Sequence, residues 1–224
     1  MEQLLLPSLS QSAPEKECLS GRTQDAACRL AQIIRIGSAP PFMVAVLLLL
    51  LHGTGQPGFD QPSALLCGFL FLCIVPLLAY PAARLIPALR KQGREGERKT
   101  AFLFSALSYG SGWIVSFVMQ NRPLLLLFTI YTLSVGLLLL WNKGFGVRAS
   151  GHGCSVVGPL ALSALYLGWW TLLPGAVVYA AIFWSSRRLG RHTAREFLLG
   201  SGLCLLAMVL SAGIFFLLGL FPFE

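Results

Sequence analysis

The chain has 224 residues, of which 55% are hydrophobic and 12% charged, and its formal net charge is +8. It is too apolar for a soluble domain, because its apolar residues gather in blocks long enough to cross a bilayer. Positive charge beside such blocks indicates contact with anionic lipid headgroups. No stretch resembles a nucleic-acid-binding module, so we expect no nucleic-acid partner.

Residues 1–38 form a polar segment that precedes the first apolar block. Within this segment apolar residues recur at helical spacing, with Arg29 and Arg35 between them. The pattern predicts an amphipathic helix over 24–36 that lies at the membrane interface. The remainder of the chain, 39–224, is expected to form a transmembrane domain.

Seven segments of this domain are nearly free of charge: 39–54, 63–87, 101–119, 123–141, 153–168, 172–186 and 196–220. Backbone groups in lipid must be satisfied within the protein, which leaves helices or closed barrels, and continuous leucine-rich runs favour helices. The fold predicted is an all-α integral membrane protein with six to seven transmembrane helices in a bundle. The segments 153–168 and 172–186 are short, so either two short passes or a re-entrant hairpin would fit them.

The distribution of positive charge predicts the orientation. With seven segments, one side of the membrane holds all of the 17 Lys and Arg residues except Arg122. Loops rich in Lys and Arg stay in the cytoplasm, so we expect the N-terminus and the basic loops there. We expect the protein to lie in a bacterial inner (plasma) membrane.

Two basic loops on this side each contain a histidine. The first reads N-K-G-F-G-V-R-A-S-G-H-G over 142–153, and the second reads R-R-L-G-R-H-T-A-R-E over 187–196. Their candidate phosphate-binding residues are Lys143, Arg148, Ser150, Gly151, Arg187 and Arg191, and their candidate catalytic residues are His152, His192 and Glu196.

These residue types suit chemistry on a phosphate ester. Its anionic oxygens need a cradle of cationic side chains and backbone N–H groups, and a helix N-terminus at Ser150 would supply N–H donors. Histidine acts as a nucleophile or a general acid near neutral pH. If the last helix begins by about residue 192, Glu196 lies one turn beyond His192 and can hold its imidazole in one tautomer.

The two loops together resemble the type 2 phosphatidic acid phosphatase superfamily. The third motif of that family, S-R-x5-H-x3-D, is similar to the stretch from Ser185 through His192 to Glu196, and its second motif, P-S-G-H, is similar to 149–152. The R-x-S-x-H spacing of 148–152 resembles the compact K-x-S-x-H loop of a bacterial branch. The resemblance covers roughly the C-terminal two thirds of the chain.

The resemblance implies a six-helix phosphatase-type core and a lipid phosphate or diphosphate as substrate, either polyprenyl or glycerolipid. It implies that His192 attacks phosphorus to form a phosphohistidine, that Glu196 is its partner, and that His152 protonates the leaving group. No metal and no other cofactor is expected.

The chain departs from the family pattern at three points. Ser186 stands where the family has arginine, Glu196 replaces an aspartate, and the first motif, K-x6-R-P, is absent as written. The sequence leaves open which basic residue replaces the missing arginine. The alternative function is a small transporter, or a degenerate relative that binds lipid phosphate without turnover.

Overall fold

The computed structural model describes residues 26–220, without the side chains of residues 94, 95 and 98, and all regular structure in this range is helical. The first helix, α2 (Ala26–Gly37), confirms the helix predicted over 24–36 where the two ranges overlap. The rest of the polar N-terminal segment lies outside the described residues.

The helices that follow coincide closely with the seven apolar segments. Helix α3 (Pro40–Gly53) begins with two prolines and is bent by 58° from α2, because proline disfavours a helical residue before it and fits the first turn of the helix it starts. The remaining long helices are α8 (Arg94–Val118), α9 (Arg122–Leu139), α10 (Gly151–Leu167), α11 (Leu172–Arg188) and α12 (Ala194–Leu217).

The second apolar segment is an interrupted helix. It comprises α4 (Pro62–Gly68), a π-helical stretch η1 (Phe69–Ile74), α5 (Val75–Leu77), α6 (Ala79–Leu85) and the short α7 (Pro87–Arg90). Pro76 lacks an N–H group and crowds the preceding turn, which accounts for an irregular helix there. Two shorter turns, η2 (Leu140–Gly144) and η3 (Trp169–Thr171), follow α9 and α10.

Within the described range, four helical stretches are long and apolar enough to cross a membrane: Pro62–Leu85, Lys99–Val118, Arg122–Gly144 and Ala194–Leu217. The bent pair α2–α3 adds a fifth if it forms one span. This arrangement indicates a multi-pass membrane protein. Six to seven spans are not confirmed, because α10 and α11 have 17 residues each, or about 26 Å against a hydrocarbon core of about 30 Å.

The outer surface of the bundle is apolar. Leu85, Val118, Leu173 and Leu217 are 75–84% exposed. Apolar side chains this exposed on several helices are expected on a surface that faces lipid.

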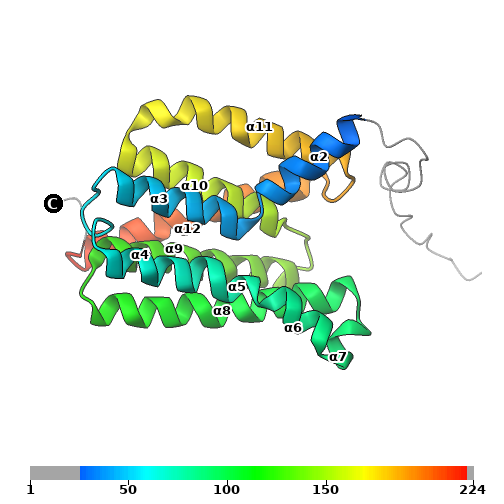
Figure 1. Ribbon diagram of the computed structural model, residues 1–224, viewed down its shortest axis with the longest axis horizontal. Coiled ribbons are helices and arrows are strands. Elements are labelled where there is room, and N and C mark those ends of the chain that lie inside the picture. The colour runs from blue at the N-terminus through cyan, green and yellow to red at the C-terminus, as the bar shows by residue number, and fades with distance from the viewer. Residues whose placement is uncertain (1–25, 221–224) are drawn as a thin grey trace, which may run out of the picture.

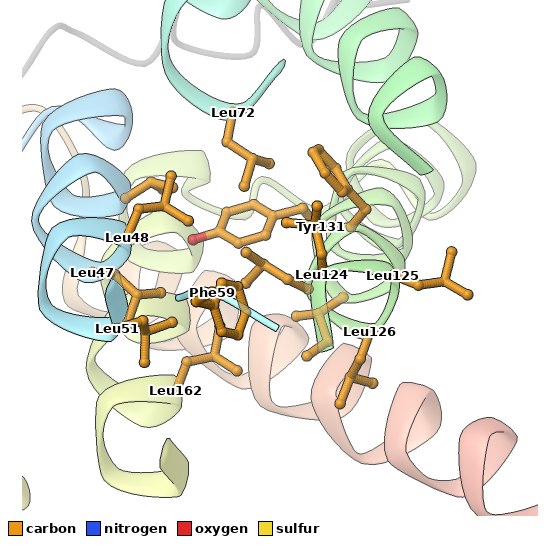
Figure 2. Packing of buried hydrophobic residues seen from close by; sticks show 14 of the residues in the cluster. Leu47, Leu48, Leu51, Phe59, Leu72, Leu124, Leu125, Leu126, Tyr131 and Leu162 are labelled. Carbon is orange, nitrogen blue, oxygen red and sulfur yellow. The ribbon is translucent and has the colours of Figure 1, made fainter. Parts of the chain in front are cut away.

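Among the described residues, the largest hydrophobic cluster joins α3, η1 and α9. In α3, residues 44, 47, 48 and 51 are buried at helical spacing and meet the first turns of α9 around Phe59 (Figure 2). This core lies toward the end of the bundle where α3 ends and α9 begins. The loops 145–150 and 189–193 lie at the opposite end, toward α2 (Figure 1), where Leu189 packs against Cys28 and Ala31.

Candidate functional site

The two histidine loops open onto one cavity of about 430 Å³. Five of the predicted site residues line it: Arg148, Gly151, His152, Arg191 and His192. The structure therefore brings together two loops that are some 40 residues apart in sequence, and both imidazoles and two guanidinium groups line one cavity.

Backbone contacts between α10 and α12 hold the two loops together. The N–H of Ser150 donates to the carbonyl of Glu196 at 2.9 Å. At Gly153 an added Cβ would lie 2.5 Å from the carbonyl oxygen of Phe197, and at Gly200 it would overlap the carbonyl oxygen of Ser150. Only residues without a side chain allow so close an approach, so these two glycines set the spacing of the histidines.

The first loop is fixed by Asn142 of η2, just beyond α9. Its Oδ1 accepts from the N–H of Ala149 at 2.9 Å, and its Nδ2 donates to the carbonyl of Leu138 at 2.8 Å. Ser150 is the N-cap of α10, and its hydroxyl accepts from the N–H of Gly153 at 3.1 Å. Such a cap satisfies a helix donor that would otherwise be unpaired.

The second loop is fixed by a capping box at the start of α12. The Thr193 hydroxyl accepts from the N–H of Glu196, and the Glu196 carboxylate accepts from the N–H of Thr193, both at 3.1 Å. The condition that the last helix begins by about residue 192 is not met, because the cap residue is Thr193 and the helix begins at Ala194. His192 therefore precedes the helix, and the N3 carboxylate reaches back to it.

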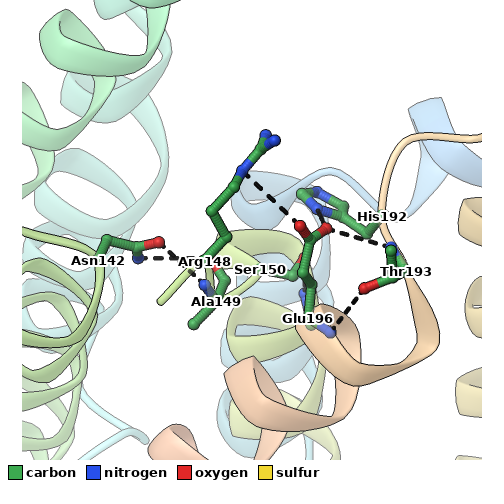
Figure 3. Close-up of polar contacts among 8 residues, drawn as sticks. Asn142, Arg148, Ala149, Ser150, His192, Thr193 and Glu196 are labelled. Carbon is green, nitrogen blue, oxygen red and sulfur yellow. Dashed lines mark hydrogen bonds and ion pairs between the residues drawn. The ribbon is translucent and has the colours of Figure 1, made fainter. Parts of the chain in front are cut away.

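Glu196 is the centre of the polar network (Figure 3). Its Oε2 lies 3.3 Å from His192 Nδ1, and its Oε1 lies 3.7 Å from Arg148 Nε. An ionised carboxylate accepts hydrogen bonds and does not donate them. The Nδ1 atom of neutral His192 therefore carries the proton, which leaves a lone pair on Nε2.

His152 is held by a different segment. Its Nε2 lies 3.1 Å from the hydroxyl of Ser38, which in turn donates to the carbonyl of Arg35 at 3.3 Å. Because the serine proton is used in the second bond, its oxygen accepts from Nε2–H. The Nδ1 atom of His152 is then the nitrogen left for a ligand.

The electrostatics of the cavity favour neutral imidazoles. Burial, together with Arg35 and His192, lowers the pKa of His152 to about 4. Burial also lowers the pKa of His192; Glu196 opposes this shift, whereas Arg35 and Arg148 reinforce it. A neutral His192 is a competent nucleophile at pH 7, and an anionic ligand would favour protonation of His152.

Four predicted residues do not line the cavity, and one of them, Glu196, contacts His192 and Arg148 from behind its wall. Lys143 and Arg187 are exposed outside it, and the side chain of Ser150 is turned inward to cap α10. Ser186, which stands at the family's arginine position, is buried near the end of α11.

Arg35, Ser38 and Glu97 are among the residues of this site that sequence reasoning missed. Arg35 and Glu97 line the cavity, and Ser38 binds His152. Arg35 arrives there because α2 packs against α11, where the Ser185 hydroxyl donates to the carbonyl of Ala31 at 2.6 Å. The helical spacing around Arg35 indicated an interfacial helix, but nothing local related it to loops more than 100 residues away.

Among residues 26–220, no three His, Cys, Asp or Glu side chains lie together as ligands for a metal ion. Comparisons of the chain with known protein families, with curated proteins and with solved structures find no match.

Proposed function

We propose that this protein is a membrane-embedded phosphatase that hydrolyses a lipid phosphate or diphosphate through a phosphohistidine intermediate. The observation that carries the proposal is the pairing of His192 Nδ1 with Glu196, at a cavity that His192, His152 and basic side chains line. A nucleophile oriented by a carboxylate, with an acid nearby, is the arrangement that covalent catalysis requires.

In the first step, His192 Nε2 attacks phosphorus, and a P–N bond forms as the P–O bond to the lipid breaks. His152, which takes up a proton on Nδ1 when the anionic phosphate binds, gives that proton to the departing oxygen. In the second step, water attacks phosphorus and gives a proton to His152. The P–N bond then breaks, its electron pair returns to Nε2, and inorganic phosphate leaves.

Charge on the phosphoryl oxygens is stabilised by guanidinium groups that line the cavity, namely those of Arg35, Arg148 and Arg191. Arg148 is well placed to move toward phosphate, because its ion pair with Glu196 is long and its side chain is 68% exposed. Ion pairs with an exposed partner of this kind contribute little to the free energy of folding. We assign to Arg35 the role of the arginine that the third motif lacks, since position 186 is buried beside the packed helices.

The substrate headgroup would enter from the interfacial layer while its tail stays in lipid. In this proposal α10 and α11 also cross the membrane as short passes, which gives six to seven spans around a six-helix core. The basic loops face the cytoplasm of a bacterial inner membrane, as the positive-inside rule predicts. The partners are then the bilayer and a polyprenyl or glycerolipid phosphate.

Phosphate release by the purified protein in detergent, over a panel of lipid phosphates, tests this function. We expect turnover that vanadate inhibits and that His192→Ala abolishes. Arg148→Ala and Arg191→Ala should each lower kcat/KM on the order of 100-fold, the size of effect typical for loss of one charge-stabilising group. Arg195→Ala is the matched control, because Arg195 is an exposed cation of the same loop region that does not line the cavity.

Absence of release from every lipid phosphate by the folded wild-type protein would refute the phosphatase. If that protein still bound the same lipids, the result would favour a lipid-phosphate-binding protein without turnover.

A further inference from the structure

The cavity continues well beyond the histidines. On α8 it is lined by residues 97, 101, 105 and 109, which recur every four residues and so form one face over about 18 Å of helix. A phosphate group bound at His152 and His192 would fill only the outer end. The inner end therefore has room for the part of a ligand that follows the phosphate.

A buried hydroxyl lies at this inner end. Tyr131 of α9 is 7% exposed, and within residues 26–220 its hydroxyl has no hydrogen-bond partner. Its ring reaches across toward Leu48 of α3, among leucine side chains that cannot accept a hydrogen bond (Figure 2). Leaving a buried hydroxyl unpaired is unfavourable, so its persistence beside a cavity points to a ligand as the missing partner.

The hydroxyl is directed toward the cavity wall formed by α10. A Cβ added at Gly158 would lie 3.5 Å from the Tyr131 oxygen, and both residues line the cavity. Gly158 lies six residues beyond His152 on the same helix, which is about 9 Å along its axis. The cavity thus offers cations and imidazoles at one end and a hydroxyl donor about 9 Å deeper.

We infer that Tyr131 forms a second polar subsite, which takes an oxygen acceptor on the tail of the bound lipid phosphate. The inference rests on the proposed function, because it places the phosphate at the histidines. An ester carbonyl on a glycerol backbone lies about six bonds from phosphorus, or roughly 7 Å at ordinary bond lengths, and a hydrogen bond adds about 3 Å. Polyprenyl phosphates have no oxygen at that distance, so the subsite selects ester-bearing lipids.

Binding of two non-hydrolysable probes to the detergent-solubilised full chain tests the subsite. One is a short-chain diacylglycerol phosphonate and the other is farnesyl phosphonate. We expect Tyr131→Phe to weaken binding of the diester about tenfold, as loss of one hydrogen bond does, and to leave farnesyl binding within about twofold. Tyr166→Phe is the matched control, because Tyr166 packs against the same core but does not line the cavity.

A second variant changes the opposite wall of the subsite, which α10 forms. Gly158→Ala places its methyl group at ordinary contact distance, 3.5 Å, from both the Tyr131 oxygen and Cys204 Sγ. It should fold normally, cover the hydroxyl and reproduce the selective loss of diester binding.

Three results would overturn the subsite: equal effects of Tyr131→Phe on both probes, no effect on either, or no binding of the diester by wild type. A lower Tm of ligand-free Tyr131→Phe would also overturn it, because the hydroxyl would then stabilise the fold.

Phosphate release from the hydrolysable parent lipids, with His192→Ala beside wild type, tests the catalytic proposal separately. If Tyr131→Phe weakened binding of the diester alone but wild type released no phosphate, the subsite would stand and the phosphatase would be refuted. If wild type released phosphate but Tyr131→Phe affected both probes equally, the phosphatase would stand and the subsite would be refuted.

Discussion

The contact between Gly200 and Ser150 provides a strong test of how the two loops are held together. In Gly200→Ala the new methyl group would overlap the carbonyl oxygen of Ser150 and lie 2.9 Å from its carbonyl carbon. Both are backbone atoms, so relief requires α10 and α12 to separate by on the order of 1 Å. That movement stretches the hydrogen bond from the Ser150 N–H to the Glu196 carbonyl and displaces His152 from His192.

The size of the effect follows from three contributions. Overpacking costs about 2 kcal/mol and the weakened hydrogen bond about 1 kcal/mol, whereas alanine in place of glycine gains about 1 kcal/mol of helix propensity. The net loss of about 2 kcal/mol should lower Tm by roughly 4–8 °C for a chain of this size. If the proposed chemistry holds, kcat/KM for phosphate release should fall on the order of 100-fold, because a misplacement of about 1 Å has that effect.

The matched control is Gly202→Ala, two residues farther along α12. An added Cβ there meets nothing within 4 Å, so this variant should be as stable as wild type or slightly more stable, with unchanged turnover. Thermal unfolding in detergent and phosphate release measure both variants. Equal Tm values for the two variants would refute the close backbone packing described here.

Two further predictions concern the first loop. Because the pKa of His152 is lowered from 6.5 to about 4 on folding, the unfolded chain binds its proton first as pH falls; stability should therefore drop between pH 6.5 and about 4, by about 2 kcal/mol near pH 5. Thermal unfolding near pH 7.5 and pH 5 should show this loss in wild type and a smaller one in His152→Gln, and an identical loss in both would contradict the assignment. Asn142→Ala should lower Tm and kcat/KM together, because it leaves the buried N–H of Ala149 without its acceptor at a cost of about 1–3 kcal/mol. Asn142→Asp keeps an acceptor oxygen and should recover most of both losses; equal losses in the two variants would show that Oδ1 is not the group that matters.

The sequence by itself determined where the helical segments lie and that His192 pairs with Glu196 in the second loop. Each helix is specified by its own run of apolar residues, and its ends by neighbours such as Pro40 and Thr193. The contact between His192 and Glu196 joins residues four apart, so local spacing was enough to predict it, although the mechanism is a capping box and not a shared helical face.

Only the tertiary structure decided which other residues reach the cavity. Ser38 and His152 are 114 positions apart, and no local pattern on α2 specifies that it bends over the histidine loops. The inner end of the cavity depends likewise on which faces of α8, α9 and α10 meet. The hydrophobic pattern of a helix shows which of its faces is buried, but it does not show which other helix covers that face. Lys143 and Arg187 resemble phosphate ligands by sequence position, yet helix packing leaves them outside the cavity and brings Arg35 in.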